Sequence, residues 1–142
     1  SMRLEKSYRL IPREMSIEYS AFESGLDRFV RLDKEDDFIG KAALAEWQKR
    51  GSDNGFVTME VLGVVDADAR GSEAIYKDGE VVGRGTSGGY GWRCGKSLAL
   101  GLVRVDLAKI GTELEIEILG KKYQAIVIEE SPFDPKNECL RS

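Results

Sequence analysis

The second half of the chain alternates between apolar and polar residues, which is the pattern of β-strands with one buried face. Within residues 112–119, Leu114, Ile116 and Ile118 alternate with glutamates. Four further segments have strand-forming composition: "FVTMEVLG", "AIYKDGEVVGRG", "SLALGLVRV" and "KKYQAIVIEE" (residues 56–63, 74–85, 97–105 and 121–130). Turn signals separate these segments and no helical pattern lies between them, which favours a small antiparallel Greek-key or jelly-roll-like barrel over a βαβ unit.

The first half has a different pattern. Residues 3–30 mix charged and apolar residues without a sustained period, and Pro12 interrupts any helix, so we predict an arm with one short helical turn. Residues 31–51 begin with an acidic run, carry apolar residues at helical spacing within 38–47, and end at Gly51. This arrangement predicts one amphipathic helix.

The fold class that follows is α+β and mainly β. We predict an arm and amphipathic helix over residues 1–54 and a β-barrel domain over residues 55–142. A chain of 142 residues with 42% hydrophobic content is long enough to bury a core.

Charge and residue usage exclude several classes of function. The net charge is −4, and the 21 basic residues are interleaved with 25 acidic ones, so we predict no nucleic-acid partner. The sequence has no long apolar run and no leader pattern, so we expect no membrane contact and a cytoplasmic location. Histidine is absent, which removes the commonest metal ligand and the usual catalytic base, and no metal site is predicted.

The stretch "EVVGRGTSGGYGWRCGKS" resembles two phosphate-binding signatures. Gly83, Gly85 and Gly88 form a G-x-G-x-x-G, but the following segment has a strand pattern, and a dinucleotide loop requires a helix there. The P-loop spacing requires a glycine where Tyr90 stands. We therefore predict that Gly83 to Gly91 form a loop or strand bend with no helix after it. We also expect at least one of Tyr90, Trp92 and Arg93 to pack on a partner.

Four segments in order resemble one family. They are "MRLEKSYRL", "FESGLDRFVRLDKEDDFIGKAAL", "IYKDGEVVGRGTSGGYGWRCGKSLALGLV" and "GTELEIEILGKKYQAIVIEESPFDP". In this order they resemble the C-terminal part of the folate-dependent aminomethyltransferase family, which includes the glycine cleavage T-protein and the C-terminal regions of dimethylglycine and sarcosine dehydrogenases. The resemblance covers nearly the whole chain.

The resemblance implies a function that the residue patterns alone do not. Members of the family transfer a one-carbon unit from an amine to tetrahydrofolate, and in the dehydrogenase branch a separate N-terminal domain carries FAD. The family's catalytic aspartate lies in a preceding domain that is not part of this sequence. The resemblance therefore implies a C-terminal fragment that is inactive alone, with the upstream catalytic domain of the same chain as its partner and a small methylated amine as substrate.

The resemblance also implies three carrier-binding residues. Arg3 matches the arginine of the family's "RLE" motif at the folate site, where a guanidinium suits a pterin edge or a glutamate tail. Glu5 matches the glutamate of this motif, and the alternative that it simply holds Arg3 stays open. Glu23 matches the glutamate of a "P-x-E-x-G-L" motif, and the alternative of an ordinary exposed glutamate stays open. No catalytic residue is predicted in this chain.

Two departures from the family pattern bear on carrier binding. Where the family has an aromatic residue, glycine and a polar-acidic pair, this chain has "IPRE" at residues 11–14. Where T-proteins carry "GLSW", it has "GLDR" at residues 25–28. Loss of a stacking ring removes about 0.5 to 1.5 kcal/mol beyond burial. A non-catalytic structural or interaction module that has lost carrier binding is therefore the alternative function.

Overall fold

The computed structural model describes residues 1–141, and Ser142, the last residue of the predicted barrel domain, lies outside the described part. The strands are β1 (Asn54–Val61), β2 (Ala74–Lys77), β3 (Glu80–Gly91), β4 (Lys96–Arg104), β5 (Glu113–Ile118) and β6 (Lys121–Ile128). The helices are α1 (Met2–Glu5), α2 (Lys41–Arg50) and α3 (Glu138–Arg141), with 3₁₀ turns η1 (Asp27–Phe29) and η2 (Val105–Leu107).

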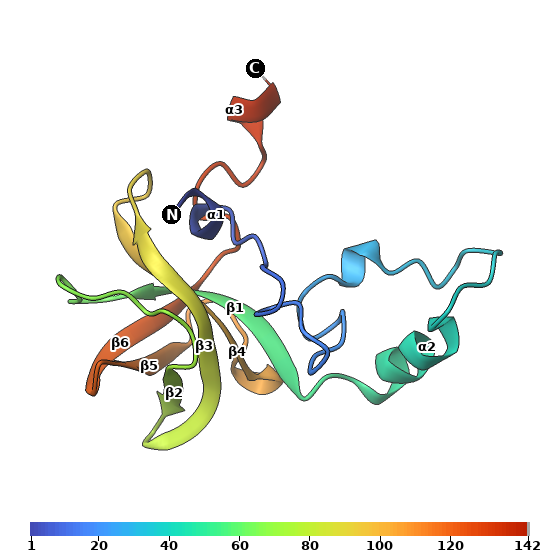
Figure 1. Cartoon of the computed structure of the whole chain (residues 1–142), viewed down its shortest axis with the longest axis horizontal. Helices are drawn as coiled ribbons and strands as arrows, with labels where there is room; N and C mark the ends of the chain where they lie inside the picture. Colours follow the sequence, from blue (N-terminus) through green and yellow to red (C-terminus); the bar gives the residue numbers. More distant parts are fainter. Residues whose placement is uncertain (142) are drawn as a thin grey trace.

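The strands form one closed barrel in the order β1-β4-β3-β2-β5-β6, with β6 pairing back onto β1 (Figure 1). Every pairing is antiparallel. The mainly-β class and the antiparallel barrel predicted from the alternating pattern are confirmed. Segment 74–85 contributes to two strands because the Asp78–Gly79 turn divides it.

The barrel core comes from the inward-facing positions of the strands. On β5, Leu114, Ile116 and Ile118 are at most 2% exposed, as the alternation with glutamates predicts. Met59 of β1 and Ile75 of β2 are fully buried in the same cluster. The closed order of the six strands surrounds this core.

The glycine-rich stretch is part of a strand. β3 continues to Gly91 with a bulge between Gly85 and Ser87, and a turn then leads into β4. The predicted absence of a following helix is confirmed. At Gly88 a Cβ would lie 2.7 Å from the Cβ of Ala69 and closer still to the Ala69 carbonyl oxygen, so the neighbouring backbone passes too close for any side chain.

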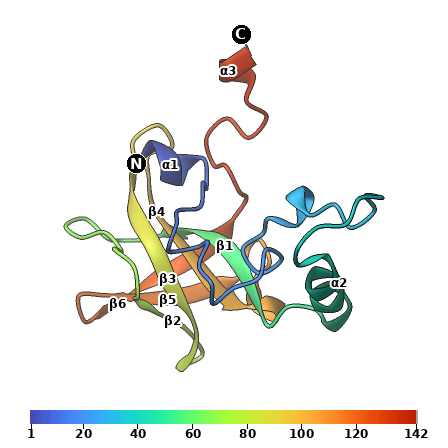
Figure 2. The same cartoon turned by 45° about the vertical axis from the view of Figure 1, so that its right-hand side comes forward.

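The arm and its two helices lie outside the barrel. α1 contacts β3 and β4, and both views show it beside this hairpin, whereas α2 stands apart from the barrel (Figures 1 and 2). The predicted helix ends at Gly51 with a φ of +83°, but none of its residues is buried, so its apolar side is not packed on the barrel. Among residues 1–141 no helix is long and apolar enough to cross a membrane.

Candidate functional site

Arg3 lies at the junction of the arm and the barrel. It belongs to α1, and its Nη1 donates a hydrogen bond to the Tyr8 carbonyl oxygen at 2.8 Å. The same nitrogen lies 3.6 Å from Oε2 of Glu14. Nε and Nη2 have no hydrogen-bond partner within residues 1–141, and 31% of the side chain is exposed. One edge of the guanidinium is thus held while donors remain for a ligand.

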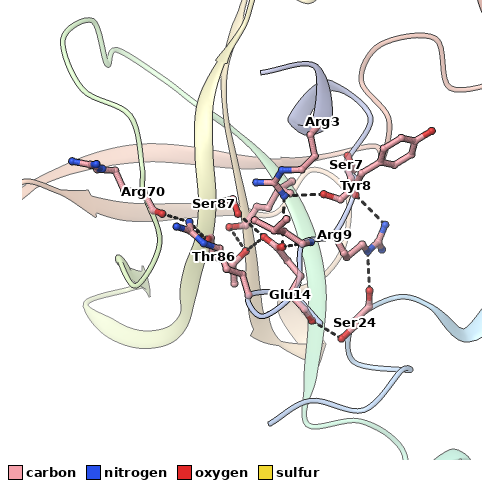
Figure 3. Close-up of polar contacts among 12 residues, drawn as sticks. Arg3, Ser7, Tyr8, Arg9, Glu14, Ser24, Arg70, Thr86 and Ser87 are labelled. Carbon is pink, nitrogen blue, oxygen red and sulfur yellow. Dashed lines mark hydrogen bonds and ion pairs between the residues drawn. The ribbon is translucent and has the colours of Figure 1, made fainter. Parts of the chain in front are cut away.

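Glu14 is the centre of the polar network at this junction (Figure 3). It is fully buried, and its Oε1 accepts hydrogen bonds from the hydroxyls of Thr86 at 2.5 Å and Ser87 at 2.7 Å on β3. Its Oε2 accepts from the Leu10 amide at 2.7 Å. Burial raises the pKa of Glu14, but these hydrogen bonds outweigh it and hold the pKa below its ordinary value of 4.5. Glu14 is therefore ionised at neutral pH opposite Arg3.

Two further arm residues fasten the arm to the barrel. The hydroxyl of Ser7 is buried and accepts hydrogen bonds from Thr58 Oγ1 at 2.8 Å and from the Ser131 amide at 3.0 Å. Arg9 donates to both oxygens of Glu130, at 2.8 and 2.9 Å, and stacks over the ring of Phe56 at 3.8 Å. These contacts fix the chain between Arg3 and Glu14 on the barrel surface.

Glu5 anchors the hairpin between β3 and β4. Its side chain is 2% exposed, and Oε1 accepts a hydrogen bond from the Arg93 amide at 2.7 Å. The Arg93 guanidinium in turn lies 4.9 Å from the ring centre of Phe133, which confirms that a side chain of this loop packs on a partner. The hydrogen bond of Glu5 is with the hairpin rather than with Arg3, and its contact with a carrier stays a prediction.

Glu23 holds a turn of the arm against β1. Its Oε2 accepts from the Ser20 amide and hydroxyl, both at 3.0 Å, and its Oε1 accepts from Asn54 Nδ2 at 3.2 Å. Burial raises the pKa of Glu23, but the hydrogen bonds from Ser20 and Asn54 lower it below 4.5. Glu23 is 3% exposed and lies in a separate set of contacts from the Arg3–Glu14 pair, so a role at a carrier stays a prediction.

The three predicted residues therefore belong to three separate sets of contacts, and Glu14 is a fourth buried or partly buried polar residue at this junction. Glu14 belongs to the "IPRE" departure from the family pattern, and no role at the carrier was predicted for it. The sequence signal for a buried Glu14 was its place in an apolar and basic segment. A carboxylate that is buried needs hydrogen-bond or ion-pair partners, which the sequence does not identify. For Glu23, the reciprocal Ser20–Glu23 hydrogen bonds follow the S-x-x-E spacing of a capping box, which the sequence displays.

Comparison with known proteins explains this architecture. Residues 55–134, which contain all six strands except the first residue of β1, match the family described as the glycine cleavage T-protein C-terminal barrel domain. The chain belongs to this family. Membership in the glycine cleavage T-protein C-terminal barrel family confirms the resemblance found in the sequence.

The relatives place this barrel in longer proteins. Human mitochondrial dimethylglycine dehydrogenase is 42% identical over 130 residues, which are 92% of this chain and 15% of that protein. Aminomethyltransferase from Synechocystis is 38% identical over 128 residues, which are 90% of this chain and 34% of that protein. The chain thus spans a seventh to a third of these relatives, so whole-protein activities come to it only as proposals.

A solved structure has the same fold. The crystal structure of glycine cleavage system aminomethyltransferase T from Bartonella henselae superposes with a TM-score of 0.81 at 24% identity. The superposition covers 94% of this chain and 37% of that chain. The arm and the barrel together therefore correspond to part of a larger structure.

Proposed function

We propose that this chain is the C-terminal part of a tetrahydrofolate-dependent aminomethyltransferase, or of an enzyme like dimethylglycine or sarcosine dehydrogenase, and helps to form its folate site. The observation that carries the proposal is the state of Arg3. This arginine of the "RLE" motif has one nitrogen fixed by Tyr8 and Glu14 and keeps exposed donors. Such a group can form paired hydrogen bonds to a carboxylate or a pterin edge at little entropic cost.

The residues that follow Arg3 in the arm supply some of the apolar surface that a folate carrier needs. Ile11, at the position of the family's aromatic residue, is 71% exposed and offers apolar area without a stacking ring. Tyr8 is 53% exposed, its ring points away from Glu14, and its backbone oxygen is the hydrogen-bond partner of Arg3 (Figure 3). The Tyr8 backbone thus positions Arg3, while its ring is an exposed aromatic group of the same segment.

In this proposal the chain's own residues bind and orient the carrier. Arg3 holds an anionic or carbonyl edge of tetrahydrofolate, and Glu14 keeps the guanidinium in place from the buried side. The carrier accepts a one-carbon unit released from a methylated amine by the upstream catalytic domain. FAD belongs to a further N-terminal domain if the parent is a dehydrogenase. The chain alone is inactive in either case.

The direct test is binding of a tetrahydrofolate analogue to the full-length parent. We expect saturable binding of 5-formyltetrahydrofolate by calorimetry, and about a tenfold or greater weakening in Arg3→Ala, because hydrogen bonds to a charged group contribute about 1.5 to 3 kcal/mol. Arg31→Ala is the matched control, since Arg31 is exposed and its one ion pair among the described residues is with Asp33. No binding to a folded parent, or equal weakening in both variants, contradicts the proposal.

A second candidate function is a non-catalytic module that docks on another domain. Exposed apolar side chains along the arm favour it: Ile17 is 106% exposed, Phe29 68% and Ile39 105%. A groove of about 600 Å³ lies nearby and is lined mainly by apolar residues including Ile11, Met15 and Leu26. Surfaces of this kind mark contacts with other proteins or domains. A parent that binds its upstream domain through this face but binds no folate analogue supports this alternative.

The cellular location is also a proposal. The sequence leads us to expect the cytoplasm, whereas the human, rat and mouse relatives are named as mitochondrial proteins. Fractionation of the source cells distinguishes the two compartments.

A further inference from the structure

A cavity lined by three arginines lies on the side of the Glu14 network away from Arg3. It has a volume of about 240 Å³ and lies between the arm, the connection from β1 to β2, and β3. Arg13, Arg70 and Arg84 line this arginine cavity together with Gly71, Gly85 and Thr86. Arg3 is not among the lining residues, so the cavity is distinct from the proposed carrier site.

The three guanidinium groups are incompletely paired within residues 1–141. Among residues 1–141 the Arg70 side chain has no hydrogen-bond or ion-pair partner, and it points away from the Glu14 network (Figure 3). Arg84 donates through Nη2 to Glu18 at 2.7 Å, but its buried Nε has no acceptor in the described part of the chain. Arg13 uses only Nη1, which donates to the carbonyl oxygens of Arg70 and Thr86.

The carboxylates around the cavity do not neutralise it. Glu18 pairs with Arg84. Glu73 accepts hydrogen bonds from the amides of Arg70 at 2.6 Å and Gly71 at 2.7 Å, so its oxygens are engaged with backbone. Glu14 lies behind Thr86 and pairs with Arg3 on its other side. Three guanidinium groups against Glu18 and Glu73 leave one positive charge in excess.

The backbone keeps the cavity in place. Gly71 has a φ of +121°, and a Cβ on it would lie 2.7 Å from the Thr86 carbonyl oxygen and 3.0 Å from Arg13 Nη1. Glycine at this position allows the connection to approach β3 and Arg13 closely. The fold therefore places the three arginines around one cavity, where an anion would be attracted by their positive charges.

We infer that the arginine cavity binds a small oxyanion, a carboxylate or phosphate group, held by Arg70 and Arg84 with Arg13 behind them. Guanidinium groups match the paired oxygens of both anions. The free Arg70 side chain makes the first contact, because it breaks no existing bond on binding. The site goes beyond the proposed folate function and does not depend on it.

The test is a titration of the ¹⁵N-labelled chain with inorganic phosphate and, separately, with glutarate, followed by NMR. We expect saturable shifts of the Gly71 and Gly85 amides, and the tighter of the two anions identifies the group that the cavity takes. Arg70→Gln should weaken binding about tenfold or more, since it removes a charged hydrogen-bond partner. Sodium chloride at the same ionic strength controls for screening.

Arg104→Gln is the matched control, because Arg104 is an exposed barrel arginine that pairs with Asp106. This substitution removes one positive charge, as Arg70→Gln does. Arg84→Gln gives a second variant with the same expected loss. Retained binding in Arg104→Gln together with loss in both cavity variants supports the site. Absence of saturable shifts with either anion, or equal weakening in the cavity and control variants, overturns it.

Discussion

Replacement of the buried Glu14 by glutamine tests the polar network that joins the arm to the barrel. The amide oxygen can still accept from Thr86 and Ser87, but the amide nitrogen would then face the Leu10 N–H and the Arg3 guanidinium. Loss of a charged hydrogen bond and of an acceptor for a buried donor makes Glu14→Gln less stable by about 2 to 4 kcal/mol. This is a large part of the stability of an ordinary domain.

The assay is urea unfolding of the chain, followed by far-ultraviolet circular dichroism at neutral pH. Glu113→Gln is the matched control, because Glu113 is an exposed residue of β5 whose side chain makes no hydrogen bond or ion pair within residues 1–141, and its change should stay within about 0.5 kcal/mol. Equal free energies of unfolding for wild type and Glu14→Gln would refute the reasoning.

The pH dependence gives the same prediction an independent check. Because the folded-state pKa of Glu14 lies below 4.5, its contribution to stability is fully present above the unfolded pKa and is lost as the pH falls through the folded pKa. The difference in unfolding free energy between wild type and Glu14→Gln should thus be largest near pH 7 and shrink below pH 4.5. A difference that grows on acidification contradicts the assigned hydrogen bonds.

Two further predictions concern the glycine strand and the parent enzyme. Gly88→Ala should destabilise the chain by about 1 to 3 kcal/mol, because the new Cβ meets the backbone and Cβ of Ala69; urea unfolding measures it, and an unchanged midpoint contradicts the close approach. The full-length parent, purified without added cofactor, should show the visible absorption bands of bound flavin if it belongs to the dehydrogenase branch. A colourless parent that remains colourless after incubation with FAD assigns it to the flavin-free aminomethyltransferases instead.

The barrel was predictable because its strands have a local pattern. The alternation of Leu114, Ile116 and Ile118 with glutamates fixes which face is buried, and the glycines with no helical pattern after them exclude a dinucleotide loop. Closure between β1 and β6 was less accessible, because it depends on pairing between segments about seventy residues apart. Local periodicity carries no information on such pairing.

The site was harder to predict because it depends on contacts between distant residues. The motif that contains Arg3 was found from resemblance, but the partner of Glu5 is an amide in the β3–β4 hairpin, 88 positions along the chain. Glu14 likewise meets Thr86 and Ser87 over more than seventy positions. A buried carboxylate is recognisable only when the donors around it are known, and the three-dimensional fold supplies them.

The measurement that tests the proposed function most directly is the fate of the one-carbon unit in the full-length parent. With a methylated amine such as dimethylglycine, the oxidant that its catalytic domain requires and tetrahydrofolate, we predict methylenetetrahydrofolate as the product in wild type and in Arg31→Ala. In Arg3→Ala the oxidised amine, an iminium ion, should instead react with water and release formaldehyde, while consumption of the amine continues at a similar rate. Unchanged formation of methylenetetrahydrofolate by Arg3→Ala would contradict a carrier-binding role for this arginine.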